Sequence, residues 1–224
     1  MRALSKPLFT ILTLSLTACS LRAADIGPDI KQWNKTVDKA IAFLKSKQGE
    51  DGSWSGDRSP GITGIALTGV LKSGRVSVDD PMVRKAVQYI EGLINPKAGH
   101  IAGKDPAVKL QNYVTCINVM ALAAAKKTSY KAVIKNAAQF LKKLQWDDSE
   151  GKTDKDDFYG GAGYNSKSRP DLSNTQFFID ALVEAGISKD DPAFKRALVF
   201  INRCQNIDSE TNDQPWAKKI DDGS

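Results

Sequence analysis

The segment VDKAIAFLKSKQ at residues 37–48 recurs three times, as VRKAVQYIEGLI at 83–94, IKNAAQFLKKLQ at 134–145 and FKRALVFINRCQ at 194–205. The copies share an alanine, an aromatic and an aliphatic position, which are Ala40, Phe43 and Leu44 in the first copy. This spacing places the shared residues on a single helical stripe. The pattern therefore predicts four amphipathic helices, each with one face toward solvent.

A second and more apolar pattern lies between these segments, as TGIALTGVLKSG at 63–74, TCINVMALAAAK at 115–126 and TQFFIDALVEAG at 175–186. Gly74 and Gly186 stand where a left-handed cap would end two of these helices. Asp-Pro pairs at 80–81 and 191–192 predict the starts of two amphipathic helices. We expect alternating outer and inner helices, in which each hairpin buries its apolar face against the next.

A short motif after the first amphipathic helix, Gln48-Gly49-Glu50-Asp51-Gly52-Ser53-Trp54, resembles the QW motif of squalene and oxidosqualene cyclases and of protein prenyltransferase subunits. Degraded copies follow the later outer helices. In that family the motif is a structural clasp between successive repeats, and the matching positions here are Gln48, Gly52, Trp54, Gln145, Gln205 and Trp216.

The resemblance to this terpenoid cyclase-like family covers residues 33–216 and implies an all-α fold of the α/α toroid type. The sequence holds three helix pairs and one further outer helix, about half of what a closed ring in the family uses. We therefore expect half a ring or an open arc over residues 25–224, incomplete at the C-terminus or completed by a second chain.

Residues 1–24 have the features of a signal peptide: two basic residues, an apolar run from Leu8 to Leu16, and small residues after it. The run is about half of the ~20 residues that span a bilayer, which favours a cleaved signal over a transmembrane helix. Leu16-Thr17-Ala18-Cys19 also fits a bacterial lipobox, which would lipidate Cys19; ordinary cleavage near Ala23 or Ala24 is the alternative. We expect export to the periplasm, the cell envelope or the medium.

The distribution of charge indicates which partners to expect, and the cysteine positions indicate whether a disulfide forms. Without the predicted signal peptide, 29 basic residues stand against 26 acidic ones, and they are interspersed along helix faces. No basic stripe with interleaved aromatic residues occurs, so nucleic acid is not the expected partner. Cys116 and Cys204 lie within apolar helical patterns, and we expect both to be buried free thiols.

Squalene-hopene cyclases protonate their substrate with a D-x-D-D-T motif. The segment Pro170-Asp171-Leu172-Ser173-Asn174-Thr175 matches that motif in part. Asp171 and Thr175 match, but Ser173 and Asn174 replace the two acids that include the proton donor. Because a hydroxyl is far too weak an acid to protonate an alkene, we interpret the segment as a helix cap, with Asp171 as a weak catalytic candidate.

Other chemistries have weaker signals. Asp154-Lys155-Asp156-Asp157 lies in a polar loop whose spacing does not fit an EF-hand, which favours a solvated acidic loop over a calcium site. The prenyltransferase zinc site needs Asp, Cys and His, but His100 is the only histidine and no Asp-x-Cys pattern occurs. The sequence thus predicts no metal and no cofactor.

The sequence favours a non-catalytic exported module that binds an isoprenoid, another lipid or a protein. The alternative is a cyclase or prenyltransferase-type enzyme with catalytic residues in a missing C-terminal half, so enzymatic activity stays open. A third hypothesis is a glycan-binding or glycan-cleaving toroid, whose groove would be lined by four aromatic residues: Trp33, Trp146, Tyr159 and Tyr164.

Overall fold

The fold comes from a computed structural model of the 224-residue chain. The structure describes residues 27, 29–56, 59–103, 110–205, 209, 210, 212, 214 and 215. The predicted signal peptide, Cys19 and Trp216 lie outside these residues.

The described part of the chain is helical and contains no strand, which confirms the predicted all-α class. The outer helices are α1 (Ile30–Lys47), α3 (Pro81–Gly92), α5 (Lys131–Lys142) and α7 (Pro192–Cys204). The inner helices are α2 (Pro60–Lys72), α4 (Gln111–Ala124) and α6 (Leu172–Glu184). Two 3-10 turns, η2 (Thr128–Tyr130) and η3 (Asp148–Glu150), lie in the connections. Every helix begins two to seven residues before its repeated sequence segment, because the repeated segment covers only the aligned positions and leaves out the start of the helix.

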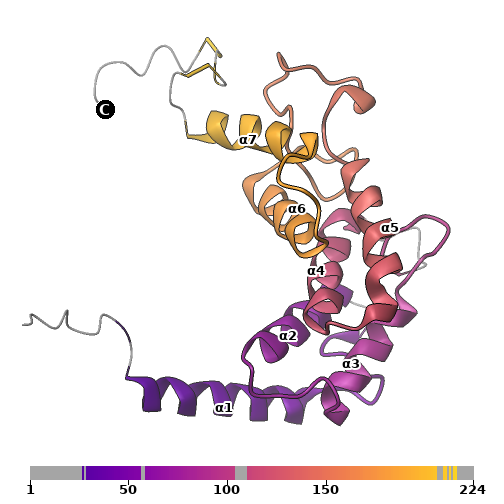
Figure 1. The fold of residues 1–224 in the computed structure, drawn as a ribbon, viewed down its shortest axis with the longest axis vertical. Helices are drawn as coiled ribbons and strands as arrows, with labels where there is room; N and C mark the ends of the chain where they lie inside the picture. The colour runs from indigo at the N-terminus through magenta and orange to yellow at the C-terminus, as the bar shows by residue number, and fades with distance from the viewer. Residues whose placement is uncertain are drawn as a thin grey trace, which may run out of the picture.

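The helices alternate between two layers that follow an arc (Figure 1). Helices α2, α4 and α6 pack side by side, while α3 packs on α2, α5 on α4, and α7 on α6. Helix α1 lies at one end of the arc and α7 at the other.

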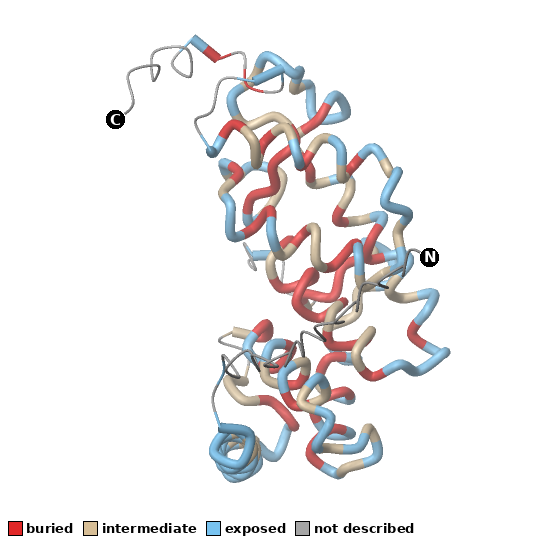
Figure 2. The backbone as a smooth tube through the Cα atoms, turned by 60° about the vertical axis from the view of Figure 1, so that its left-hand side comes forward, coloured by how far each residue is buried: buried red, intermediate tan, exposed pale blue. Residues whose placement is uncertain are grey.

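The core lies between the two layers. Its largest fully buried side chains come from the inner helices and from α3 and α5; among them are Leu67, Ile117, Leu122, Phe178, Leu182, Ile90 and Leu141. Figure 2 shows buried backbone through the middle of the arc and an exposed helix at one end. That helix is α1, in which no residue is buried.

Two outer helices, α3 and α7, begin at the Asp-Pro pairs that predict their starts. The side chain of Asp80 accepts a hydrogen bond from the Met82 amide at 2.8 Å, and that of Asp191 accepts one from the Ala193 amide at 2.9 Å. In both helices a proline occupies the first turn, where its missing N–H is not needed.

Successive repeats are joined by glutamine side chains that reach across from one outer helix to the next. The Gln48 amide nitrogen donates to the carbonyl of Gly52 at 2.9 Å and to that of Met82, in α3, at 2.8 Å. Gln145 repeats the arrangement with Gly160 at 2.8 Å and Ala193, in α7, at 2.9 Å. Met82 and Ala193 are equivalent positions directly after the helix-starting proline.

Glycines let the connecting loops touch the next outer helix. Gly52 and Gly160 both have φ of +85°, and a Cβ at either would overlap a backbone carbonyl, of Lys85 or of Arg196. Gly99, with φ of +90°, lies less closely against Asn136 of α5, because a Cβ there would be 3.3 Å from the Asn136 carbonyl oxygen. The three contacted residues are equivalent in the outer-helix alignment, so one contact recurs three times.

The aligned threonines complete the junction. The hydroxyl oxygens of Thr63, Thr115 and Thr175 accept hydrogen bonds from the amides of Trp54, Ile101 and Ala162, at 3.2, 3.2 and 3.0 Å. Each of these amides lies two residues after the contact glycine. We call the glycine contact together with the threonine hydrogen bond the repeat clasp; Gln48 and Gln145 reinforce it in the first and third copies.

We expect Gly160→Ala to lower the free energy of unfolding by about 3 kcal/mol or more, because left-handed strain and overlap with Arg196 act together. Gly74→Ala is the matched control, since Gly74 has φ of +68° but no atom lies within 4 Å of the place that an added methyl group would occupy. It should lose only about 1 kcal/mol. Urea unfolding followed by circular dichroism measures both, and equal losses would contradict the clasp.

Candidate functional site

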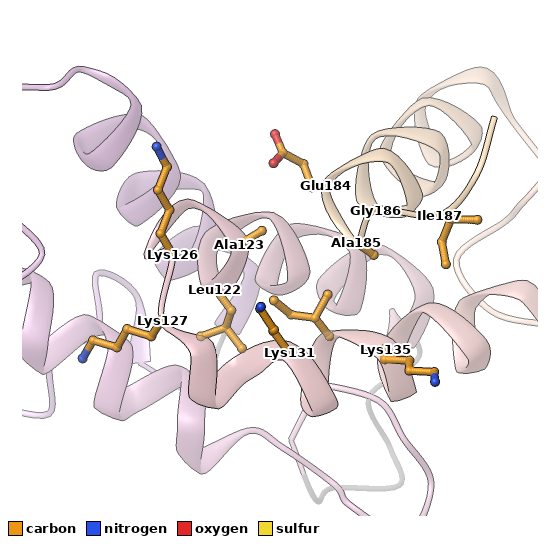
Figure 3. Close-up of a pocket in the computed structure, with 11 residues that line it drawn as sticks. Leu122, Ala123, Lys126, Lys127, Lys131, Lys135, Glu184, Ala185, Gly186 and Ile187 are labelled. Atoms are coloured by element: carbon orange, nitrogen blue, oxygen red, sulfur yellow. The ribbon is translucent and has the colours of Figure 1, made fainter.

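The site with the most distinctive chemistry is a pocket where α4, α5 and α6 meet (Figure 3). Its volume is about 560 Å³, within the usual range for a small-molecule site. Apolar side chains of Leu122, Ile134 and Ile187 line part of it. We call it the lysine pocket, because four lysines complete the lining: Lys126, Lys127, Lys131 and Lys135.

Among the described residues, three of the four lysines of this pocket have no acidic partner. The one acidic residue in the lining, Glu184, forms an ion pair with Lys72 at 2.5 Å. Within the described residues, Lys126, Lys131 and Lys135 form no ion pair. Lys131 is also the first residue of α5, where the positive end of the helix dipole disfavours a cation. A bound anion would compensate the charge of the lysines and would also interact favourably with the positive end of α5.

Lys126 has an unusual backbone conformation. Its φ of 53° makes it the one non-glycine residue with positive φ in the described part of the chain. The equivalent residues after α2 and α6 are Gly74 and Gly186, with φ of +68° and +72°. Lysine thus occupies a cap position that glycine fills in the other two repeats, at a cost of about 1–2 kcal/mol. Such a strained residue beside a pocket supports a functional role for its side chain.

The pocket can therefore hold a ligand with an apolar part and an anionic head. The apolar part would lie on Leu122, Ile134 and Ile187. The four ammonium groups point in different directions around the pocket (Figure 3), and their combined positive charge would attract the anionic head.

A second pocket, of about 410 Å³, contains the weak catalytic candidate Asp171. One Asp171 oxygen accepts from the Asn174 amide at 2.8 Å and the other from the Asn174 side chain at 2.7 Å. Both oxygens thus serve the start of α6, as expected of a cap residue. Phe158, Phe200 and Arg203 are among the other lining residues.

The acidic loop before α6, residues 147–157, is held against α7 by an ion pair and hydrogen bonds. Asp147 pairs with Arg196 at 2.8 Å. Arg203 of α7 donates to the backbone carbonyls of Asp154 and Asp156. The pKa of Asp156 is lowered, chiefly by hydrogen bonding to the Thr153 amide. No group of three or more metal-ligating side chains comes together among the described residues.

Trp33 lies apart from the other three aromatic candidates. Trp146 contacts Phe158 with ring centroids 6.1 Å apart and donates to the Ser166 carbonyl at 3.2 Å. Tyr159 donates to Asp148 at 3.3 Å, and Tyr164 lies beside Tyr113 with centroids 5.9 Å apart. Trp33 is on α1, at the other end of the arc from the loop that carries Trp146 (Figure 1).

The histidine and the two cysteines of the described chain lie outside both pockets or at their edge, and their burial differs. His100 is buried against Phe140, with ring centroids 5.3 Å apart, and burial lowers its pKa. Cys116 is a buried free thiol whose pKa burial raises well above its usual value. Cys204, the last residue of α7, is free as expected, but the expectation that it is buried was wrong, because its side chain is exposed.

Comparison of this chain with protein-family models, with curated proteins and with solved structures gives no match. In the described part of the chain, the helices fall short of the length and apolarity that crossing a membrane requires.

Sequence reasoning did not find the lysine pocket. Its residues come from three helices and the turns beside them, and lysines on a polar helix face give no local signal. One clue was present: Lys126 aligns with Gly74 and Gly186, so a non-glycine stands where the repeat demands a left-handed cap.

Replacing Lys126 with glycine should raise the free energy of unfolding by about 1 kcal/mol, because glycine adopts the left-handed conformation without strain. Lys127→Gly is the control. Lys127 has φ of −83°, so glycine there adds only backbone entropy and should destabilise slightly. Thermal unfolding compares the two, and a destabilised Lys126→Gly variant would show that residue 126 is not strained.

Proposed function

We propose that this chain is an exported, non-catalytic repeat module that binds an anionic amphiphile, with an isoprenoid phosphate as the representative ligand. The lysine pocket carries the proposal, because it combines an apolar lining with lysines that form no ion pair within the described residues. The relation to squalene cyclases and prenyltransferases, the signal peptide at 1–24 and lipidation at Cys19 belong to the same proposal. So does an α/α toroid, with the arc as half of a ring or as an open arc.

The repeat clasp supports the family relation. The motif positions Gln48, Gly52 and Trp54 lie at the first clasp, and Gln145 and Gly160 lie at the third. The hydrogen bonds from Gln48 to the Met82 carbonyl and from Gln145 to the Ala193 carbonyl run between successive repeats, as the family's motif would require. Gln205 is exposed at the end of α7, at the position of a further clasp glutamine.

The enzyme alternative places its catalytic residues in a missing C-terminal half, and Asp171, the one candidate within this chain, gives it no support. A cyclase would need an acid free to protonate its substrate, and Asp171 is engaged at both oxygens by Asn174. Ser173 and Asn174 cannot supply the missing carboxyl groups. Binding without chemistry is therefore the favoured function.

Isothermal titration of residues 25–224 with farnesyl diphosphate and with farnesol tests the proposal. The diphosphate should bind more tightly, and Lys131→Gln with Lys135→Gln should weaken its binding about tenfold, since two charge-assisted contacts are lost. Lys195→Gln on α7 is the control, because Lys195 is exposed and outside the pocket. Equal affinity for the two ligands, or an unaffected double variant, would contradict the proposal.

A further inference from the structure

The first repeat exposes a surface that is buried in the second. In α3, Met82 and Ala86 are 3% and 0% exposed, whereas no residue of α1 is buried, including their equivalents Thr36 and Ala40. Ile62 and Ile65 of α2 are 46% and 48% exposed, but their equivalents in α4, Val114 and Ile117, are both 2% exposed. We call the exposed faces of α1 and α2 the N-terminal edge.

Aromatic residues show the same difference. Tyr89 and Phe140, the shared aromatic residues of α3 and α5, lie on the loop of the preceding repeat: Tyr89 donates to the Gly56 carbonyl at 2.9 Å, and Phe140 packs on His100. Phe43 occupies this position in α1 and is 60% exposed. Trp33 and Ile30, further along the same helix, are 53% and 65% exposed.

The charge of α1 indicates what this edge contacts. The helix carries Lys31, Lys35, Lys39, Lys45 and Lys47 against a single acid, Asp38. Asp38 is itself paired with Arg75 at 3.2 Å. A second copy docked through this edge would bring two cationic helices together, which is unfavourable. An anionic partner is complementary.

We infer that the N-terminal edge lies on an anionic lipid surface, with α1 as an interfacial helix. A helix with tryptophan, phenylalanine and isoleucine side chains exposed beside several lysines has the composition of helices that lie in the headgroup region. The position of α1 at one end of the arc leaves it accessible to a flat surface (Figure 1). The inference does not depend on lipidation of Cys19 or on the lysine pocket.

Sedimentation with vesicles tests the inference on residues 25–224. The protein should bind vesicles of phosphatidylglycerol and phosphatidylcholine in equal parts, but not vesicles of phosphatidylcholine alone. Trp33→Ser with Phe43→Ser should reduce binding at least about tenfold, because two large apolar contacts are lost. Lys35→Gln with Lys39→Gln should reduce it by about fivefold per lysine and weaken its salt dependence.

Two variants serve as controls. Leu198→Ser on α7 removes a side chain that is 55% exposed at the other end of the arc, and it should leave vesicle binding unchanged. Lys195→Gln on α7 removes an exposed lysine that lies outside both the N-terminal edge and the lysine pocket, and it should also leave vesicle binding unchanged. Circular dichroism verifies that each variant is folded.

Three results would overturn the inference: no binding to the anionic vesicles, binding by the aromatic double variant equal to that of the unmodified chain, or a dimer in sedimentation velocity that the aromatic double variant disperses. The last result would assign the edge to a second copy.

Discussion

The repeat clasp is the constraint on which the rest of the structure depends. A helical hairpin of this size cannot bury its own apolar face, so the fold exists only if neighbouring hairpins pack at a fixed distance and angle. The glycine sets the distance, because its loop touches the backbone of the next outer helix directly. The threonine hydroxyl sets the position of the inner helix relative to that loop. A buried glutamine such as Gln145, 0% exposed, then satisfies two carbonyls that would otherwise cost about 1–3 kcal/mol each.

Much of this fold could be predicted from the sequence. The outer and inner helices follow from two apolar patterns, and their starts follow from Asp80 and Asp191 before proline. Thr63, Thr115 and Thr175 align in the inner-helix pattern, so their equivalent positions could be predicted. The hydrogen bond that each accepts from a loop amide could not. The second clasp was hidden because Ile94 replaces the glutamine, so only Gly99 and Thr115 reveal it.

The candidate site was much less predictable. Chemistry in a sequence is sought in clusters of acids, histidines and cysteines, and here those residues are caps, ion pairs or buried packing: Asp171 caps α6, Asp147 pairs with Arg196, and His100 packs on Phe140. The lysine pocket depends on the approach of three helices, which only the packing defines. The exposure of α1 was equally invisible, because its apolar stripe resembles that of α3 and differs only in what covers it.

Amide hydrogen exchange at Trp54, Ile101 and Ala162 tests the central claim most directly. These amides lie in loops, yet each donates to a threonine hydroxyl at an equivalent junction. The clasp predicts that all three exchange as slowly as amides within the inner helices, since they open only when the repeats separate. If these three amides exchanged as rapidly as exposed loop amides do, the repeats would not be held together in this way.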